Sequence, residues 1–129
     1  MARILIIEDE RPLADLLAGI LEREGHEVLA AANAADGIGR AIAHRPDVVI
    51  ADWMLTNRIH SGEAASRIRA ACPHVKIIII TGHPEIASRA RSWCDCIDEV
   101  LEKPFHSKRL VAAVRRLLPE EEPFLAEVC

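Results

Sequence analysis

The sequence predicts an α/β fold, in which helices cover both faces of a doubly wound parallel sheet. Short apolar runs alternate with amphipathic stretches along the chain, and each clear run ends abruptly at polar residues. The runs are apolar at successive positions, not only at alternate ones. Strands that are apolar on both sides are typical of a parallel sheet buried between two layers of helices.

Five apolar runs are the expected strands. The clear ones cover residues 4–7, 48–51 and 77–80, and weaker candidates cover residues 28–32 and 100–102. The clear runs end at Glu8-Asp9, at Asp52 and at Thr81-Gly82, respectively. Because the flanking residues are charged or turn-forming, these ends also mark where each strand stops.

Five helices are expected between and after these strands. Pro12 opens the first and Gly25 closes it, and its apolar face consists of Leu13, Leu16, Leu17, Ile20 and Leu21. Asn33 caps the second helix, which has Asp36 in its first turn. Its inward-facing residues are expected to be Ile38, Ala41 and Ile42. The third lies between Ser61-Gly62 and Pro73, with one face formed by Ala64, Ala65, Ile68, Ala71 and Cys72.

The last two helices follow the same periodicity. The fourth is marked by Ile86, Ala90, Trp93 and Cys94, and the fifth by Leu110, Val111, Val114, Leu117 and Leu118. Right-handed crossovers between the strands then give a five-stranded (βα)5 sheet in the order 2-1-3-4-5. We expect one domain over residues 1–118, followed by a tail or linker remnant over residues 119–129.

Composition excludes several classes of protein. The chain has 129 residues, a net charge of −4 and only 3% aromatic residues, with no Tyr. No basic stripe is present to neutralise phosphates, so we expect no direct contact with nucleic acid. No apolar run reaches the roughly 18 residues that span a bilayer, and no signal peptide is recognisable, so we expect a cytoplasmic protein without a membrane segment.

The four cysteines are Cys72, Cys94, Cys96 and Cys129. Their spacing does not match a metal-binding pattern, since Cys94 and Cys96 are separated by one residue where zinc knuckles and redox motifs usually have two. In a reducing compartment we expect ordinary free thiols.

Polar residues follow four of the predicted strands: Glu8, Asp9, Asp52, Thr81 and Lys103. The carboxyl ends of parallel strands share one edge of the sheet, where ligands bind at the reversal of strand order. Clustered carboxylates suit Mg²⁺, and a carboxylate can also accept a phosphoryl group as a nucleophile. Taken singly, Glu8 and Asp9 are also explained as helix caps or solvated acids, Asp52 and Thr81 as turn residues, and Lys103 as a surface lysine before a proline.

Their ordered combination resembles the receiver domain of two-component response regulators, similar to single-domain chemotaxis-type receivers, over about residues 2–118. The motifs that carry the resemblance are Ile4-Leu5-Ile6-Ile7-Glu8-Asp9-Glu10, Pro46-Asp47-Val48-Val49-Ile50-Ala51-Asp52, Ile78-Ile79-Ile80-Thr81-Gly82 and Lys103-Pro104-Phe105. The resemblance implies a flavodoxin-like fold and Mg²⁺ as the cofactor. It also implies a histidine kinase or a histidine phosphotransfer protein as the source of phosphoryl groups.

The resemblance assigns a role to each site residue. It implies that Asp52 is the phosphoacceptor, that Asp9 ligates Mg²⁺ directly, that Glu8 does so mainly through water, and that Met54 contributes its backbone carbonyl. The resemblance also implies that the Thr81 hydroxyl forms a hydrogen bond with the phosphoryl group and so reports its presence. Gly82 is expected to leave room for the phosphoryl group, and Lys103 to pair with that group. The resemblance also implies a cis peptide bond between Lys103 and Pro104.

The sequence departs from the family pattern at two places beside this site. Val100 stands where receivers usually have Tyr or Phe, so the usual coupling between the Thr hydroxyl and an aromatic ring is in doubt. The loop after Asp52 has Thr56 and His60 where a proline and a glycine are common. With a glycine only at position 62, we expect a loop longer by about two residues.

Two further positions bear on the lifetime of the phosphoryl group. Met54 cannot orient an attacking water, so we expect slow self-dephosphorylation. His83 is either a pH-sensitive gate or an exposed loop histidine.

We therefore expect a phosphoryl-accepting switch, not an independent turnover enzyme. It would meet a second copy or a downstream protein through the fourth helix, fifth strand and fifth helix. This side carries Arg89, Arg91, Trp93, Lys108, Arg109, Arg115 and Arg116, which are otherwise simply solvated helix faces. One alternative is a phosphorylation-independent docking module on the same scaffold. Another is a Mg²⁺-dependent phosphatase, although the chain is short for a lid and lacks an Asp-x-Asp after its first strand.

Overall fold

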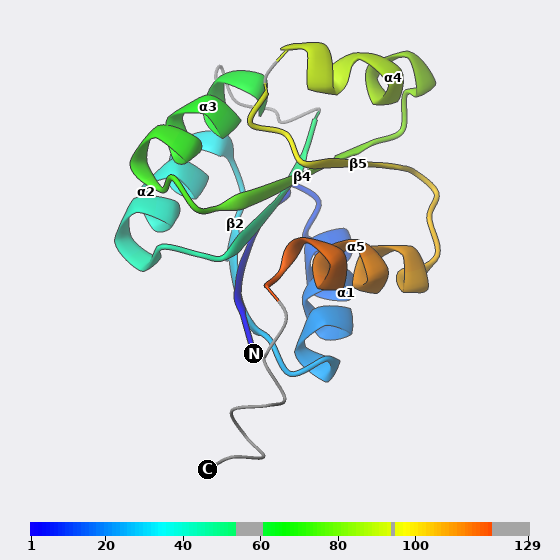
Figure 1. Ribbon diagram of the computed structural model, residues 1–129. Coiled ribbons are helices and arrows are strands. Elements are labelled where there is room, and N and C mark those ends of the chain that lie inside the picture. Colours follow the sequence, from blue (N-terminus) through cyan, green and yellow to red (C-terminus); the bar gives the residue numbers. More distant parts are fainter. Residues whose placement is uncertain (54–60, 94, 120–129) are drawn as a thin grey trace.

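The computed structural model describes residues 1–53, 61–93 and 95–119, in which five strands alternate with five helices (Figure 1). In chain order the elements are β1 (Arg3–Ile7), α1 (Arg11–Arg23), β2 (Glu27–Ala31), α2 (Ala34–His44), β3 (Val48–Asp52), α3 (Ser61–Ala71), β4 (Lys76–Thr81), α4 (Pro84–Trp93), β5 (Glu99–Glu102) and α5 (Ser107–Leu117). All strand pairs are parallel and the order is β2-β1-β3-β4-β5. The predicted flavodoxin-like topology is confirmed.

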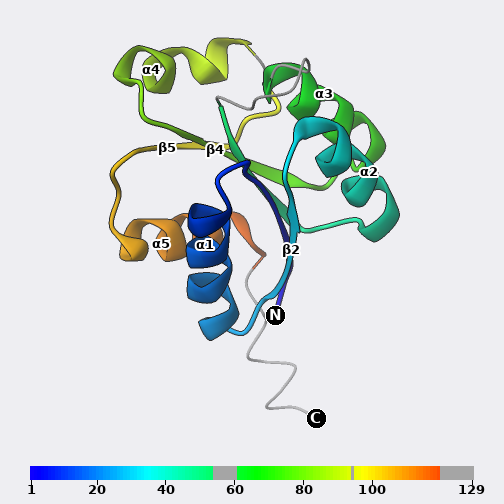
Figure 2. The same ribbon diagram turned by 180° about the vertical axis from the view of Figure 1, so that it is seen from behind.

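The sheet separates two apolar cores. Helices α1 and α5 cover one face, and α2, α3 and α4 cover the other, as the two opposite views show (Figures 1 and 2). Successive residues of β1 alternate between them: Leu5 and Ile7 belong to the second core, Ile4 and Ile6 to the first. Because neighbouring side chains of a strand point to opposite faces, each apolar run supplies both cores at once.

Strand register brings the predicted site residues to one edge of the sheet. Ile7 is opposite Ala51 in the β1–β3 pair, and Asp52 is opposite Ile80 in the β3–β4 pair. In the β4–β5 pair Thr81 is opposite Glu102. The residues that end β1, β3, β4 and β5 therefore lie side by side.

Helix α2 begins as predicted, because the Asn33 side chain accepts a hydrogen bond from the Asp36 N–H at 2.9 Å. The inward positions assigned to Leu16 and Ile42 are wrong, since these side chains are 60% and 50% exposed. Each lies next in sequence to a buried residue, Leu17 or Ala41, and is rotated from it by about 100° around the helix. The apolar stripe is thus wider than the surface that actually packs.

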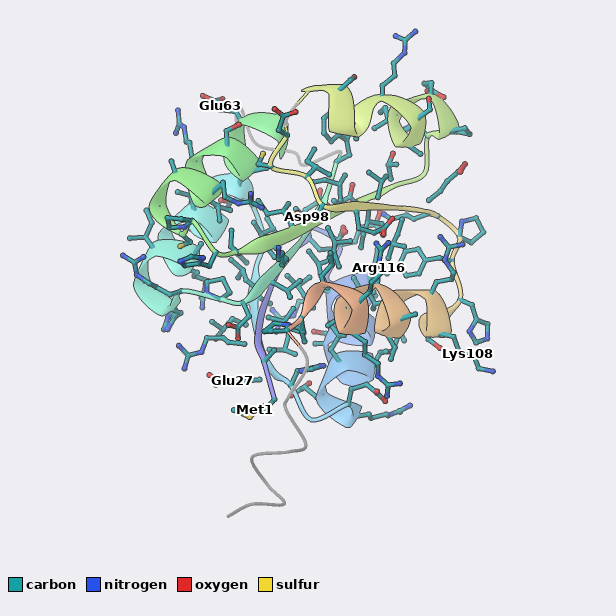
Figure 3. All side chains as sticks on the ribbon, viewed as in Figure 1. Met1, Glu27, Glu63, Asp98, Lys108 and Arg116 are labelled. Carbon is teal, nitrogen blue, oxygen red and sulfur yellow. The ribbon has the colours of Figure 1, made fainter. Side chains whose placement is uncertain are left out.

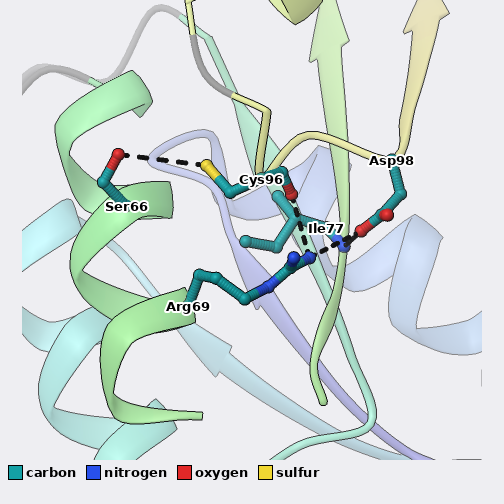
Figure 4. A network of polar contacts seen from close by, with 5 residues as sticks. All are labelled: Ser66, Arg69, Ile77, Cys96 and Asp98. Carbon is teal, nitrogen blue, oxygen red and sulfur yellow. Dashed lines mark hydrogen bonds and ion pairs between the residues drawn. The ribbon is translucent and has the colours of Figure 1, made fainter. Parts of the chain in front are cut away.

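A polar network fixes the segment that leads into β5 (Figure 4). Arg69 of α3 donates to the Cys96 carbonyl at 3.0 Å and to Asp98 Oδ2 at 2.9 Å. The same Asp98 oxygen accepts the Ile77 N–H of β4 at 2.8 Å. Asp98 therefore ties the start of β5 to both β4 and α3.

The cysteines only partly follow the expectation of free thiols. Cys72 is free and buried, and its Sγ lies 3.5 Å from the Ala41 carbonyl oxygen, to which it donates. Cys96 is instead disulfide-bonded, which corrects the expectation for this residue. The spacing of cysteines in the sequence does not show which sulfur atoms approach each other in space. Cys94 and Cys129 lie outside the described residues.

Two further findings concern one peptide bond and the lengths of the helices. The Lys103–Pro104 peptide bond is cis, as the resemblance implied. Within the described residues, every helix is too short or too polar to cross a membrane.

Candidate functional site

Two carboxyl groups meet at the carboxyl edge of the sheet. Asp52 is the last residue of β3 and is 6% exposed, and Glu8 directly follows β1 and is 3% exposed. Both strands are apolar and lie in the interior of the sheet, which forces the residues at their ends into a nearly water-free position. Burial of two acids side by side is unfavourable unless a positive charge accompanies them.

Lys103 supplies that charge from the end of β5. Its Nζ lies 2.7 Å from Asp52 Oδ2, and its backbone N–H donates to the Thr81 carbonyl at 2.6 Å. Burial lowers the pKa of Lys103, but the hydrogen bond and charge of Asp52, together with Glu8 and Glu10, outweigh it and raise the pKa above 10.5. The lysine is therefore a fixed ammonium group at the site.

Glu8 is the second carboxyl group of the site. Its Oε1 accepts the Glu10 N–H at 3.1 Å, whereas its Oε2 is buried without a hydrogen bond from the described residues. Burial, and next the hydrogen bond with Asp52, raise the pKa of Glu8 to about 8. A buried carboxylate oxygen beside a second carboxyl group is the kind of oxygen ligand that a hard divalent cation takes. The pair Glu8 and Asp52 thus fits Mg²⁺.

Asp9 lies at the border of the site. It lines, with Glu8, a cavity of about 420 Å³ between α1 and α2 that also contains Arg11, Asp36 and Arg40. No group of three His, Cys, Asp or Glu side chains among the described residues is close enough to hold a metal ion. The role of Asp9 as a metal ligand stays a prediction. The Met54 carbonyl lies outside the described residues.

Thr81 is completely buried at the end of β4. Its Oγ1 accepts the His83 N–H at 3.1 Å, and α4 begins at the next residue, Pro84. The hydroxyl therefore links the carboxyl edge to the first turn of α4 through one hydrogen bond. The His83 side chain is 52% exposed, with Nδ1 3.7 Å from Glu85 Oε1. Among the described residues, a Cβ built on Gly82 would have only Lys103 Cβ within contact distance, at 4.0 Å.

A cavity of about 550 Å³ opens beside Val100. Val100 is half-buried, and the cavity wall continues from Ala87 of α4 to Lys103, Phe105 and Arg109. Because Lys103 also contacts Asp52, this cavity and the carboxyl pair share a side chain. The cavity therefore lies beside the position where the resemblance leads us to expect Tyr or Phe.

Some residues around the site were not singled out from the sequence. Arg11 and Arg40 line the cavity next to Asp9, and Trp53, the residue after Asp52, is 5% exposed. The Trp53 N–H donates to the Ile80 carbonyl at 2.8 Å, which continues the β3–β4 pairing past the carboxylate. The only sequence signal for Trp53 is its position at the end of an apolar run. Arg11 and Arg40 lie on different helices, so nothing in the sequence connects them.

Comparisons with known proteins identify the family that this chain resembles. Residues 4–115 match the family described as the response regulator receiver domain. The nitrogen assimilation regulatory protein NtrX of Azorhizobium caulinodans is 33% identical over 116 residues, which are 89% of this chain and 26% of that protein. The phosphate regulon transcriptional regulatory protein PhoB of Pseudomonas aeruginosa is 31% identical, with 93% of this chain and 53% of that protein covered.

Solved structures include close matches to the whole fold. The response regulator protein TrrA of Thermotoga maritima, solved in complex with Mg²⁺-BeF, has a TM-score of 0.81 and 32% sequence identity. The match covers 92% of this chain and all of that one. In contrast, the chain spans about a quarter of the curated NtrX and about half of the curated PhoB.

Proposed function

Because the chain belongs to the response regulator receiver domain family, the signalling modules of two-component systems, we propose that it accepts a phosphoryl group on Asp52 in a Mg²⁺-dependent reaction. The observation that carries the proposal is the buried Asp52 carboxylate, held 2.7 Å from the Lys103 ammonium and next to Glu8. A nucleophilic carboxylate beside a fixed positive charge is the arrangement that phosphoryl transfer needs.

The transfer step is a displacement at phosphorus. A carboxylate oxygen of Asp52 attacks the phosphorus of a phosphohistidine, the new P–O bond forms, and the P–N bond breaks with its electron pair going to the imidazole. The Lys103 ammonium then pairs with the phosphoryl oxygens and stabilises the negative charge that they carry. Held by Glu8, Asp9, Asp52 and the Met54 carbonyl, Mg²⁺ would supply further positive charge to these oxygens.

Thr81 would report the modification. Its hydroxyl hydrogen can turn toward a phosphoryl oxygen at the neighbouring strand end, while its oxygen holds the His83 N–H at 3.1 Å. Any shift of Thr81 is thus passed to the first turn of α4. With Val100 in place of a ring, α4 itself is the element that would carry the change to the surface formed by α4, β5 and α5. A downstream protein or a second copy would bind there.

The partners follow from the family and from the site. Receiver domains interact with histidine kinases, and we propose a sensor histidine kinase or a histidine phosphotransfer protein as the donor. The expectation of no contact with nucleic acid is not supported, since a relative of which this chain covers 53% is named a transcriptional regulatory protein. The expectation rests on the net charge of −4 and on the absence of a basic stripe in the sequence of this chain.

The test is incubation with acetyl phosphate or phosphoramidate, with and without Mg²⁺, followed by intact-mass analysis. We expect a gain of one phosphoryl group that requires Mg²⁺ and is lost in Asp52→Asn. Asp95→Asn, an exposed change in the turn after α4, is the matched control and should be phosphorylated normally. No gain in the wild type would favour a docking module, and sustained hydrolysis of a phosphate ester would favour a phosphatase.

A further inference from the structure

Strand β5 is short, lies at an edge of the sheet and buries few of its side chains. It has four residues and is the last strand in the order β2-β1-β3-β4-β5, next to β4. Leu101 is its buried residue, whereas Glu99 and Val100 are half-buried and Glu102 is exposed. A shift of two residues along β4 would leave each side chain on its own face of the sheet, so this pattern specifies the register of β5 only weakly.

The register of β5 decides where Lys103 lies. In the observed register Thr81 is opposite Glu102, and the next residue, Lys103, donates its backbone N–H to the Thr81 carbonyl. The Lys103 Nζ then lies 2.7 Å from Asp52 Oδ2. A slip of two residues would displace Lys103 by about 7 Å along β4, at roughly 3.3 Å per residue. The contact between the ammonium group and Asp52 therefore depends on this register.

Asp98, which Figure 3 labels, precedes β5 and contacts β4 through two hydrogen bonds. Its Oδ2 accepts the Ile77 N–H at 2.8 Å, and its own N–H donates to the Ile77 carbonyl at 2.8 Å. Main-chain groups that face β5 recur at every second residue of β4, so Ile79 would offer the same two groups to a strand that had slipped by two residues. The two bonds to Ile77 alone thus do not select the register.

Arg69 of α3 makes the selection. Its Nη2 lies 2.9 Å from Asp98 Oδ2 and also donates to the Cys96 carbonyl at 3.0 Å (Figure 4). Helix α3 cannot slide with β5, because Ile68 is buried in the same core as Ile77. The side chains of Arg69 and Asp98 are 30% and 22% exposed, so the ion pair is largely shielded from water. Asp98 can contact Arg69 and Ile77 together only in the observed register.

We propose that Asp98 and Arg69 are positioning residues for the reaction at Asp52, because they hold β5 in the register that brings Lys103 to the phosphoacceptor. Asp98 lies at the opposite end of β5 from Lys103, so its effect on the reaction is carried by the strand. The inference rests on the proposed phosphorylation of Asp52 and adds a role for a polar network outside the carboxyl edge. Such a role is effective because a displacement of about 1 Å at a reacting group is enough to lower a rate strongly.

The experiment measures the rate of phosphorylation by acetyl phosphate over a range of Mg²⁺ concentrations. In Asp98→Ala and Arg69→Met we expect the maximal rate to fall by roughly 10-fold, less than on removal of the lysine charge itself. The half-saturating Mg²⁺ concentration should not change, because Glu8 and Asp52 are carried by the ends of β1 and β3. A variant that merely loosened the whole fold would change both quantities.

Arg67→Met is the matched control. It is the same substitution on the same helix, but the ion pair that it removes, with Glu63 at 2.8 Å, is exposed. This variant should react at the wild-type rate. Asp98→Asn is a milder second variant, since its amide oxygen can still accept the Ile77 N–H while the charge that attracts Arg69 is lost. It should lose less of the rate than Asp98→Ala and stay folded, as measured by urea unfolding.

A double-mutant cycle tests whether Asp98 acts through Lys103. In the Lys103→Met background, Asp98→Ala should cause no further loss of rate, because the charge that it positions is already absent. A further loss as large as that in the wild-type background would overturn the proposal. Unchanged rates in both Asp98→Ala and Arg69→Met would overturn it as well.

A second measurement does not require phosphorylation. In ¹⁵N nuclear magnetic resonance spectra of the metal-free protein, Asp98→Ala should shift the amide signals of Thr81 and Lys103, and Arg67→Met should not. Unshifted signals would reject the positioning role by itself. Absence of phosphorylation in the wild type would instead reject the proposed function, so the two failures are distinguishable.

Discussion

Lys103 Nζ lies 2.7 Å from Asp52 Oδ2, although the strands that carry the two residues, β3 and β5, are separated by β4. The pair therefore reaches across the end of β4, where Thr81 is completely buried. Parallel register sets this geometry, because Asp52 is opposite Ile80 and Thr81 is opposite Glu102. The two charged groups are positioned by strands, which are more rigid than loops.

Loss of the Lys103 charge should slow phosphorylation. In Lys103→Met we expect the rate with acetyl phosphate and Mg²⁺ to fall by about 100-fold, since one fixed charge at a transition state contributes roughly 3 kcal/mol. The rate is measured by intact-mass analysis over time. Lys76→Met, at the opposite end of β4, is the control and should react at the wild-type rate. An unchanged rate in Lys103→Met would contradict the assigned role.

Glu8→Gln should stabilise the metal-free protein. The buried Glu8 carboxyl has a pKa raised to about 8, so the folded state binds its proton more tightly than the unfolded state. The wild type thus loses stability as the pH rises from about 4.5 towards about 8, and the amide does not. We expect a gain of about 1–3 kcal/mol at the upper end of this range, measured by urea unfolding with a chelator.

The same variant should respond less to Mg²⁺. Addition of Mg²⁺ should raise the unfolding free energy of the wild type more than that of Glu8→Gln, because a neutral amide is a poorer ligand than a carboxylate. Glu10→Gln, an exposed change two residues away, serves as the control. Equal stabilisation of the wild type and Glu8→Gln by Mg²⁺ would exclude Glu8 from the metal site.

Two glycines of α2 should respond in opposite directions to alanine. A Cβ on Gly37 would collide with Ile7 Cδ1 and lie 2.7 Å from Ile7 Cγ1, whereas no atom of the described residues lies within 4 Å of a Cβ on Gly39. We expect Gly37→Ala to lower the unfolding free energy by about 1–3 kcal/mol, because the fully buried Ile7 must move. Gly39→Ala should raise it by about 0.5–1 kcal/mol. Equal effects in chemical unfolding would refute the close approach.

Acid should destabilise the fold through His26. Its Nδ1 accepts the Ala2 N–H at 3.1 Å, and burial, followed by the charge of the N-terminus, lowers its pKa below 6.5. The contribution of His26 is present above pH 6.5 and is lost as the pH falls through the folded-state pKa, because the unfolded state then binds the proton more readily. His26→Asn keeps an acceptor but cannot titrate. Its unfolding free energy should therefore fall less between neutral and mildly acidic pH, and an identical fall would contradict this assignment.

A ring should be accepted at position 100. The cavity of about 550 Å³ beside Val100 leaves space for a phenyl group, so Val100→Phe should change the unfolding free energy by less than about 1 kcal/mol. The neighbouring Leu101 is 1% exposed and points into the core. Leu101→Phe should therefore cost about 1–3 kcal/mol. A large loss of stability in Val100→Phe, measured by urea unfolding, would show that the cavity does not accept the ring.

Local pattern was sufficient to predict the elements of this chain. The fully apolar run 77–80 predicted a strand covered on both faces, and Asn33 predicted the start of the helix that it caps, and both predictions are confirmed. The same patterns failed at Leu16 and Ile42, because an apolar periodicity does not tell how wide the packed surface of a helix is. The pairing state of Cys96 was likewise outside the reach of sequence spacing.

The sequence by itself determined which residues are delivered to the carboxyl edge, since this follows from short-range periodicity and from the parallel direction that crossover connections give to the strands. Only the tertiary structure decided which of those residues meet. It joined Lys103 to Asp52, left Glu8 Oε2 buried without a hydrogen bond from the described residues, and put Asp9 at the border of the pair. Such contacts depend on distances of a few tenths of an ångström between side chains on different strands, and these distances are set by the packing of all the elements together.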